Sequence, residues 1–235
     1  GLGATFQWEY STDAGTTWAD VPNAPPYSNV TTDNLGVSNV PAVYATYLYR
    51  LRVNTPAPCN LVVRSSGSSL KLKHVWTGNT STDWNTAANW SDNTVPDLSC
   101  ADVIILGSRP FQPTLTTSST INGLTINNNA YLTVNAGILN VAGTITNNGS
   151  FDLRLGTLNL NGTAGTQNIA GSMFVNKTIM HLQNSNNTGI AIGAAAGDTL
   201  KITELLDFGS VTNSTINTGN NLTMVSSAAA TASLG

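Results

Sequence analysis

The chain has 235 residues, of which 40% are hydrophobic and only 9% are charged, and its formal net charge is −3. This length suits one or two domains, and the charged fraction is well below the roughly 25% of an average soluble domain. Residues 1–73 hold five basic and four acidic side chains, and residues 74–235 hold four and eight. The composition therefore argues against a nucleic-acid partner, which needs a basic face, and no apolar run is long enough to span a membrane.

Alternation of apolar and polar residues predicts β-strands in the first 73 residues. Residues 6–10 alternate, a turn at 11–15 follows, and a return strand is expected at 16–18. Residues 47–53 alternate most strongly, with Tyr49 on one face and Arg50 on the other. Shorter strands are expected in three further places, namely 35–37, 61–64 and 70–73.

This pattern resembles an immunoglobulin-like β-sandwich. Trp8 stands where that family has its buried tryptophan, and Tyr49 stands at the tyrosine-corner position. Leu51 occupies the place of the second cysteine of antibody-type domains, so their inter-sheet disulfide is not expected. The two strands that normally precede the tryptophan strand are missing. The resemblance therefore implies a sandwich domain over residues 1–73 that lacks its N-terminal strands.

Residues 74–106 contain three of the five tryptophans, Trp76, Trp84 and Trp90, within fifteen residues. Large aromatic side chains mostly close hydrophobic layers, so we interpret this stretch as a junction and a cap. The alternative is a sugar-binding platform.

A repeat with a period near twenty residues follows. The pattern of residues 132–143 recurs nineteen residues later at 151–162, so that Leu132 corresponds to Phe151 and Leu139 to Leu158. One step earlier the offset is twenty, with Ile121 corresponding to Val141 and Tyr131 to Phe151. A period of this length built from strands and turns predicts a stacked β-solenoid over residues 107–235.

Glycine and asparagine are expected to form the turns of this solenoid. Gly137 and Gly156 would allow the corners, because glycine adopts positive φ without steric cost. The pairs 127–128 and 147–148 are both Asn-Asn and fall at equivalent turns, where stacked amides could bond along the axis.

The regularity loosens from Thr163. Residues 163–173 and 184–188 are longer excursions, and coils resume at Leu200 and Leu222 with a spacing near twenty-two. Residues 226–235 offer no capping aromatic or helix, so we expect the solenoid to continue beyond this segment.

The sequence WTGNTSTDWNTAANWSDNTVP at 76–96, followed by DVIIL at 102–106, resembles a motif of very large secreted surface proteins of the Bacteroidota. Those proteins are adhesin-like or associated with gliding motility, and the type IX secretion system exports them. The resemblance implies a right-handed parallel β-helix in an extracellular or cell-surface protein that serves as an adhesin stalk or filament. Its implied partners are neighbouring domains of the same long chain, surface polysaccharide or other cell-surface components, and further copies of itself.

An exported protein meets oxidising conditions, so the resemblance also bears on the two cysteines. A disulfide between Cys59 and Cys100 would clamp the two domains, and the alternative is that Cys59 pairs with an upstream cysteine. Asp198-Thr199-Leu200 resembles the acceptor sequence for O-glycosylation in the Bacteroidota, which would place a glycan on Thr199.

The rival interpretation is a carbohydrate-active β-helix enzyme, which needs neighbouring carboxylates or a carboxylate with a base on one outer face. After residue 110 the charged residues are few, namely Asp152, Arg154, Lys177, Asp198, Lys201, Glu204 and Asp207. Asp152 and Arg154 suggest a solvated ion pair, the group at 198–207 suggests a polar corner, and His181 has no nearby Ser or Cys nucleophile pattern.

Binding without catalysis leaves two further hypotheses. Calcium could bind the junction carboxylates, although aspartate equally forms turns; the four candidates are Asp83, Asp92, Asp97 and Asp102. Exposed Trp18, Trp84 or Trp90 would indicate a carbohydrate-binding module. We predict no catalytic residue, metal site or cofactor, and a structural or adhesive role.

Overall fold

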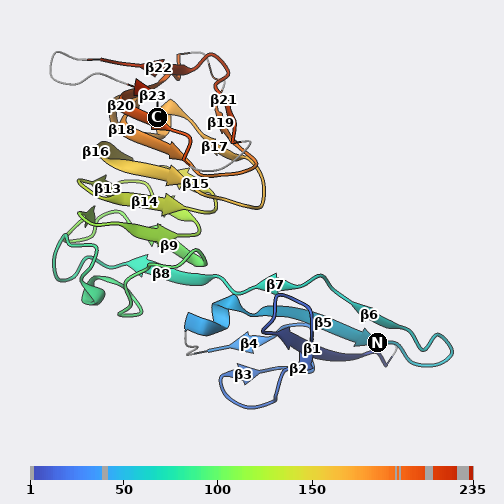
Figure 1. Ribbon diagram of the computed structural model, residues 1–235. Helices are drawn as coiled ribbons and strands as arrows, with labels where there is room; N and C mark the ends of the chain where they lie inside the picture. The colour runs from blue at the N-terminus through green and yellow to red at the C-terminus, as the bar shows by residue number, and fades with distance from the viewer. Residues whose placement is uncertain are drawn as a thin grey trace. The chain divides into compact units, whose positions relative to one another are not determined.

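The computed structural model describes residues 3–38, 42–193, 195, 197–209, 214–226 and 233–234. The protein is all-β, with 44% of residues in strands and 6% in short helices. The chain divides into two compact units, Gly1–Leu72 and Lys73–Gly235 (Figure 1).

The first unit is built on an antiparallel sheet with the strand order β2-β1-β5-β6, and β7 pairs with β5. Two short strands, β3 and β4, pair separately. The elements are β1 (Thr5–Ser11), β2 (Ala19–Asp20), β3 (Tyr27–Ser28), β4 (Gly36–Val37), the 3₁₀ helix η1 (Ala42–Thr46), β5 (Leu48–Asn54), β6 (Val62–Arg64) and β7 (Ser68–Ser69).

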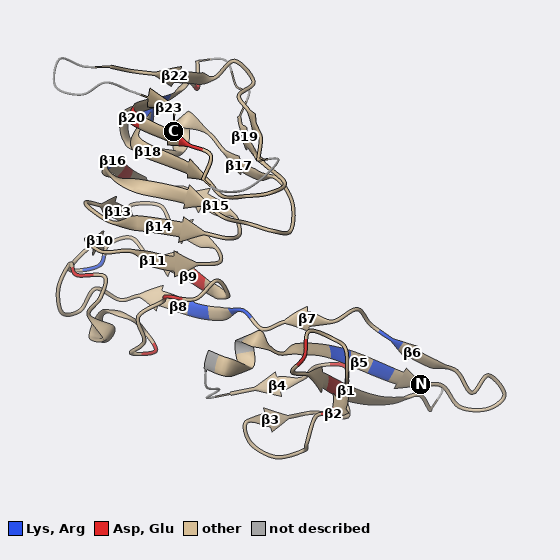
Figure 2. Cartoon of the chain, viewed as in Figure 1, with Lys and Arg blue, Asp and Glu red and all other residues tan. Residues whose placement is uncertain are grey.

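Alternation along β1 and β5 separates an aromatic face from a charged one. On the aromatic face, half-buried Trp8 packs against a core formed by Val21, Tyr27, Val30 and Tyr49. On the other face, Glu9 is buried among arginines, of which Arg50 and Arg52 lie on β5 and Arg64 lies on β6 (Figure 2).

Three details differ from the sequence prediction. The return strand begins at Ala19 and not at 16–18, because Asp13 holds the turn open by accepting bonds from both the backbone amide and the hydroxyl of Thr17. The hydroxyl of Tyr49 bonds the hydroxyl of Tyr27 at 3.1 Å, whereas a tyrosine corner bonds upstream backbone. The strand expected at 70–73 begins at Leu72 and pairs within a sheet of the second unit.

The second unit is a parallel β-solenoid of about five turns. One face carries a sheet in the order β15-β12-β9-β8 and then a second sheet, β17-β19-β21. The other strands form a nine-stranded sheet. The long strand β16 belongs to it and pairs with both β13 and β14 of the preceding coil. The elements up to β16 are β8 (Leu72–Trp76), η2 (Ala87–Asn89), β9 (Ala101–Ile105), β10 (Thr114–Leu115), β11 (Ser119–Ile121), β12 (Leu124–Ile126), β13 (Tyr131–Val134), β14 (Ile138–Val141), β15 (Ile145–Asn147) and β16 (Ser150–Leu160). Those after it are β17 (Gln167–Ile169), η3 (Gly171–Met173), η4 (Val175–Lys177), β18 (Thr178–Asn184), β19 (Ile190–Ile192), β20 (Leu200–Asp207), β21 (Ile216–Asn217), β22 (Leu222–Met224) and β23 (Ser233–Leu234).

The strand registers confirm the repeat. Leu132 pairs with Phe151 and Leu139 with Leu158, as the nineteen-residue offset predicts. The twenty-residue mapping of Tyr131 to Phe151 was wrong, because Tyr131 pairs with Ser150. The offset changes within one coil, since residues paired between β12 and β15 are twenty-one positions apart. The turn between β15 and β16 is shorter than the turn between β12 and β13, which brings the offset back to nineteen.

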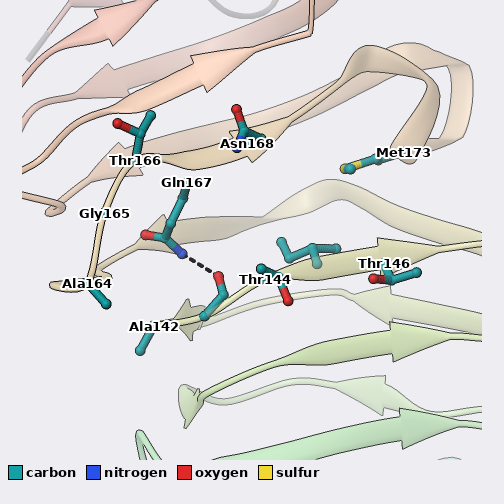
Figure 3. A pocket seen from close by; sticks show the side chains of 11 residues that line it. Ala142, Thr144, Thr146, Ala164, Gly165, Thr166, Gln167, Asn168 and Met173 are labelled. Carbon is teal, nitrogen blue, oxygen red and sulfur yellow. Dashed lines mark hydrogen bonds between the residues drawn. The ribbon is translucent and has the colours of Figure 1, made fainter. Parts of the chain in front are cut away.

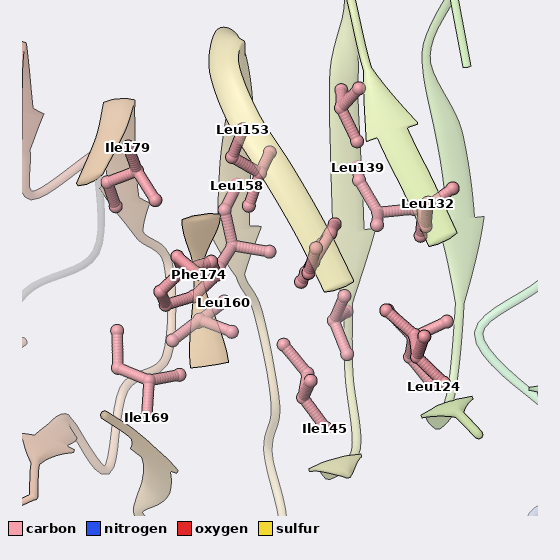
Figure 4. Close-up of a cluster of buried hydrophobic side chains, with 14 of the residues drawn as sticks. Leu124, Leu132, Leu139, Ile145, Leu153, Leu158, Leu160, Ile169, Phe174 and Ile179 are labelled. Atoms are coloured by element: carbon pink, nitrogen blue, oxygen red, sulfur yellow. The ribbon is translucent and has the colours of Figure 1, made fainter. Parts of the chain in front are cut away.

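One continuous apolar column fills the solenoid. Inward residues from successive coils stack on one another, as Figure 4 shows for Leu124, Leu132, Leu139, Ile145, Leu153 and Leu158. Phe174, which lies between η3 and η4, packs against Phe151 at a ring-centroid distance of 5.5 Å. Each fully buried aliphatic side chain contributes about 1.5–3 kcal/mol, so the column provides much of the stability of the solenoid.

Among the described residues, the structure gives no amide bond between the asparagine pairs predicted to stack, 127–128 and 147–148, and a different pair stacks on strands. Asn159 Nδ2 donates to Asn140 Oδ1 at 2.9 Å, and these residues lie on β16 and β14. At the turns, Asn147 instead accepts from Gly149 N through its Oδ1, which closes a local turn. Gly137 does form a corner with φ of +70°, whereas Gly156 lies inside β16 against Val134 of the neighbouring coil.

In the part of the chain that the structure describes, no helix has the length and apolarity that crossing a membrane requires.

Candidate functional site

The tryptophans of the junction form a closed aromatic cluster. Trp76 and Trp84 are fully buried and Trp90 is 2% exposed. Trp90 lies edge-on to both partners, with ring centroids 5.0 Å from Trp76 and 4.8 Å from Trp84. These rings have no free face for a sugar. Trp18, in the first unit, is half-buried and has the Arg50 guanidinium 3.9 Å over its ring.

A buried asparagine organises the loop around this cluster. Asn89 accepts from Thr80 N and Ser81 N through its Oδ1 and donates to Asp83 O through its Nδ2. All polar atoms of its side chain are thus bonded, as a fully buried amide requires. Trp90 Nε1 also donates to Trp84 O at 2.8 Å, so the loop folds around its own side chains.

The four junction carboxylates do not converge. Asp83 accepts from the Thr86 hydroxyl and Asp97 accepts from Thr120 N. Asp102 accepts from Asn122 and Gly123, and Asp92 lies 2.9 Å from Nδ1 of buried His74. Each carboxylate thus serves a local turn or strand contact. Within the described residues, no three Asp, Glu, His or Cys side chains gather as a metal ion requires.

Asp152 forms a local cluster on the outer side of β16. Its carboxylate bonds Arg154 at 2.7 Å and accepts from the Tyr131 hydroxyl at 3.2 Å. The hydrogen bond from Arg154 holds the pKa of Asp152 below its ordinary value, against the opposing effect of burial. Burial is also the main cause that raises the pKa of Tyr131. Asp152 is therefore ionised at neutral pH, which does not suit a general acid.

The structure brings a hydroxyl to His181 that the sequence pattern did not indicate. Thr157 Oγ1 lies 3.2 Å from His181 Nδ1, and Glu204 Oε2 lies 3.0 Å from His181 Nε2. The three residues lie on β16, β18 and β20, and they are neighbours only because successive coils place residues twenty-three or twenty-four positions apart side by side. Thr157 N already donates to Gly137 O within the ladder, so it cannot also stabilise an oxyanion.

The other candidates from the 198–207 region serve separate contacts. Asp198 accepts from the Ser172 hydroxyl at 2.9 Å, and Asp207 accepts from Gly209 N at 2.8 Å. Thr199 is half-buried beside them. The candidate disulfide partners lie in different units, with Cys59 exposed in the β5–β6 loop and Cys100 half-buried before β9.

A cavity of about 470 Å³ lies on the face where the sheet is interrupted, between β15 and β17 (Figure 3). We call it the seam. Eleven residues line it, and none of them is charged or aromatic. They are Ala142, Gly143, Thr144, Ile145, Thr146, Ala164, Gly165, Thr166, Gln167, Asn168 and Met173.

Two side-chain amides hold the ends of the seam. Gln167 is 8% exposed and donates through Nε2 to Val141 O at 2.9 Å and to Gly143 O at 2.7 Å. Its Oε1 accepts from Gly162 N at 2.8 Å. At the other end Asn147 Nδ2 donates to Met173 O. The seam is thus a built feature of the fold, bounded by satisfied hydrogen bonds.

Residues 75–188 match the model of a family described as a domain of unknown function, DUF8693. The chain is similar to that family over slightly less than half of its length, from the aromatic cap to the loop before β19. No curated protein and no solved structure matches the chain. The match includes the cap and the seam but names no activity.

Proposed function

We propose that the chain is a non-catalytic structural and adhesive segment of a large secreted cell-surface protein. The observation that carries this proposal is the uninterrupted apolar column under an outer surface of mostly uncharged side chains. Charged side chains are few on that surface, and two of them form local ion pairs, Asp152 with Arg154 and Glu204 with His181. Such a surface suits broad contact more than acid–base chemistry.

The stacked coils support the mechanical part of the proposal. Every coil bonds the coils before and after it through its backbone, so load along the axis is shared by many hydrogen bonds. The chain contains only nine lysine and arginine residues in total, which leaves few sites for trypsin-like proteases. Both properties suit a stalk or filament at the cell surface.

The resemblance of residues 76–96 and 102–106 supports the protein class. We infer type IX export, an extracellular location and a role in cell adhesion or gliding motility. In this proposal the solenoid is a right-handed β-helix over 107–235 with its cap at 74–106, and residues 1–73 are an incomplete immunoglobulin-like sandwich. Neighbouring domains of the same long chain, surface polysaccharide and further copies are the expected partners.

Two covalent features belong to the same proposal. Export through an oxidising compartment would let Cys59 and Cys100 form a disulfide, which thiol titration of denatured, unreduced protein tests, since two free thiols would exclude it. A glycan on Thr199 would add mass to native material, and an intact mass equal to the bare sequence would exclude it.

The purified chain distinguishes this proposal from the two carbohydrate hypotheses. We expect no release of reducing or unsaturated ends from acidic or neutral polysaccharides, measured against heat-inactivated protein. Turnover that disappears in Glu204→Gln or Asp152→Asn would establish the enzyme interpretation instead. Retention of the chain on immobilised polysaccharide without turnover would establish a carbohydrate-binding module.

A further inference from the structure

The seam exists because one coil leaves the ladder for a few residues. After Gly143, the chain enters β15 directly and pairs with β12. After the equivalent Gly162, residues 163–165 form bends, and the next strand, β17, begins only at Gln167. Strand β15 therefore ends one sheet and β17 begins another, and both are edge strands on the same face.

The hydrogen bonds of β15 show which of its groups face the seam. Thr144 O accepts from Leu124 N, and Asn148 N donates to Ile126 O, so these groups point toward β12. In a strand, the N–H and C=O of one residue point to the same side, and those of the next residue point to the opposite side. The backbone groups of Ile145 and Asn147 consequently point away from β12 and into the seam.

The same reasoning applies to β17. Gln167 N donates to Gly189 O, and Ile169 O accepts from Gly193 N, so both residues bond the following coil. Asn168, which lies between them, turns its N–H and C=O toward the seam. The seam thus presents ladder-forming backbone groups from both of its edges.

The lining indicates the chemistry of the occupant. Ile145 and Met173 are the larger apolar residues of the lining, which we call its floor, and Thr144, Thr146 and Asn168 form its uncharged polar rim. Figure 3 labels Met173 and the three rim residues. Sugars are held mainly by aromatic stacking and by charged partners, and none of these eleven residues is aromatic or charged. An extended peptide matches better, because it supplies backbone bonds to both edges and side chains that alternate between floor and rim.

We propose that the seam is an acceptor site for an extended, uncharged peptide strand from a partner protein. The strand pairs with the edges of β15 and β17 and completes the interrupted face. Gln167 and Asn147 keep the site open by bonding the groups at its two ends. The biological use of such a partner rests on the proposed adhesive role, but peptide binding itself does not. Peptide binding by the purified chain and attachment of whole cells can therefore fail separately.

The probe is a capped synthetic peptide with the sequence of residues 123–128, Gly-Leu-Thr-Ile-Asn-Asn, which includes β12. Strand β12 pairs with the edge of β15 that faces away from the seam. Its side chains therefore already suit a strand that lies beside β15. Amide hydrogen exchange of the native chain is followed as the peptide is added. We expect saturable slowing of exchange at Ile145, Asn147 and Asn168. A control peptide carrying Thr125→Pro lacks one N–H, so about tenfold more of it should be needed for the same slowing.

Two variants at one position supply the matched comparison. Asn168→Pro removes the N–H that faces the seam and leaves the ladder to β19 intact, and we expect peptide binding to weaken by about tenfold, as loss of one backbone hydrogen bond predicts. Asn168→Ala removes only the exposed side chain and keeps the N–H, so we expect it to weaken binding less than Asn168→Pro, and the difference between the two variants measures the contribution of the N–H. Circular dichroism melts check that both variants fold.

Several outcomes would overturn the proposal. They are the absence of saturable binding, protection at amides remote from the seam, and equal binding by the proline peptide. Protection of the same three amides by neutral oligosaccharides and not by the peptide would assign the seam to a sugar. The exchange measurement on the native chain decides the matter even if Asn168→Pro does not fold.

Discussion

Glu9 is the residue on which the charged face of the first unit depends. It is 4% exposed and bonds Arg50 at 2.6 Å and Arg52 at 2.7 Å, with Arg64 at 3.3 Å. Burial raises the pKa of Glu9, but the hydrogen bond from Arg50 and the charges of the three arginines outweigh it, so the pKa lies below 4.5. A carboxylate with a lowered pKa stabilises the folded state above its ordinary pKa and loses that contribution as pH falls through the lowered value.

Glu9→Gln should therefore destabilise the first unit by about 2 kcal/mol at pH 7, less than the roughly 3–5 kcal/mol of a fully buried pair because the arginines are partly exposed. The difference from wild type should shrink below pH 4.5 and vanish below the lowered pKa. Calorimetric melts from pH 7 to strongly acidic conditions measure it. The control is Asp20→Asn, since Asp20 is 55% exposed and should change stability by less than about 0.5 kcal/mol. A pH-independent difference would refute this account of Glu9.

At the scale of the element, the coil depends on close approach of neighbouring turns. Gly137 has φ of +70°, and a Cβ at this position would overlap the backbone of Thr117 in the coil before it. Gly197 has a similar φ, at +77°, but nothing lies within 4 Å of the position a Cβ would take. Replacing each of these two glycines by alanine separates the steric cost of an added Cβ from the cost of the backbone conformation.

We expect Gly137→Ala to cost more than about 2 kcal/mol and Gly197→Ala only about 1 kcal/mol, the cost of positive φ alone. Urea unfolding of the two variants and of wild type gives both values from the shift in midpoint. Equal costs would show that the turns do not approach as closely as the structure indicates.

The aromatic cap is the element that closes the solenoid at its first coil. Trp90→Ala should destabilise the solenoid by about 3–5 kcal/mol, because it leaves a cavity between Trp76 and Trp84. Coils interact with nearest neighbours, so amide exchange should accelerate most in β9 and β12 and least in β20. Trp18→Ala, in the first unit, should leave these rates unchanged. A uniform acceleration along all coils would contradict the capping role.

The sequence predicted the coil better than it predicted the seam. Leu132, Leu139 and their partners nineteen residues later carry the same apolar pattern in each coil, so their register could be read from spacing alone. The excursion from Thr163 was also visible. Gln167 gives no such signal, because its bonds to Val141 and Gly143 cross more than twenty residues and depend on how a bend folds back. The row of Thr157, His181 and Glu204 was missed for the same reason, since it needs the unequal coil lengths.

At the scale of the whole molecule, one apolar column stabilises the solenoid, and most of the outer side chains are uncharged. In the proposed role this neutral surface contacts other molecules, and the seam adds a directional contact to it. Repetition of the coil, and not a single pocket, would then set the strength of attachment, because many weak contacts act together along one rod.

The direct test of this central claim is attachment of native cells whose parent protein lacks residues 73–235, with surface display of the remaining protein measured in parallel by labelling intact cells. The deletion removes the whole second unit and leaves the first unit in place. With display at the wild-type level, the account predicts that fewer cells remain attached under flow, or that gliding slows. Attachment and gliding equal to wild type at equal display would contradict it.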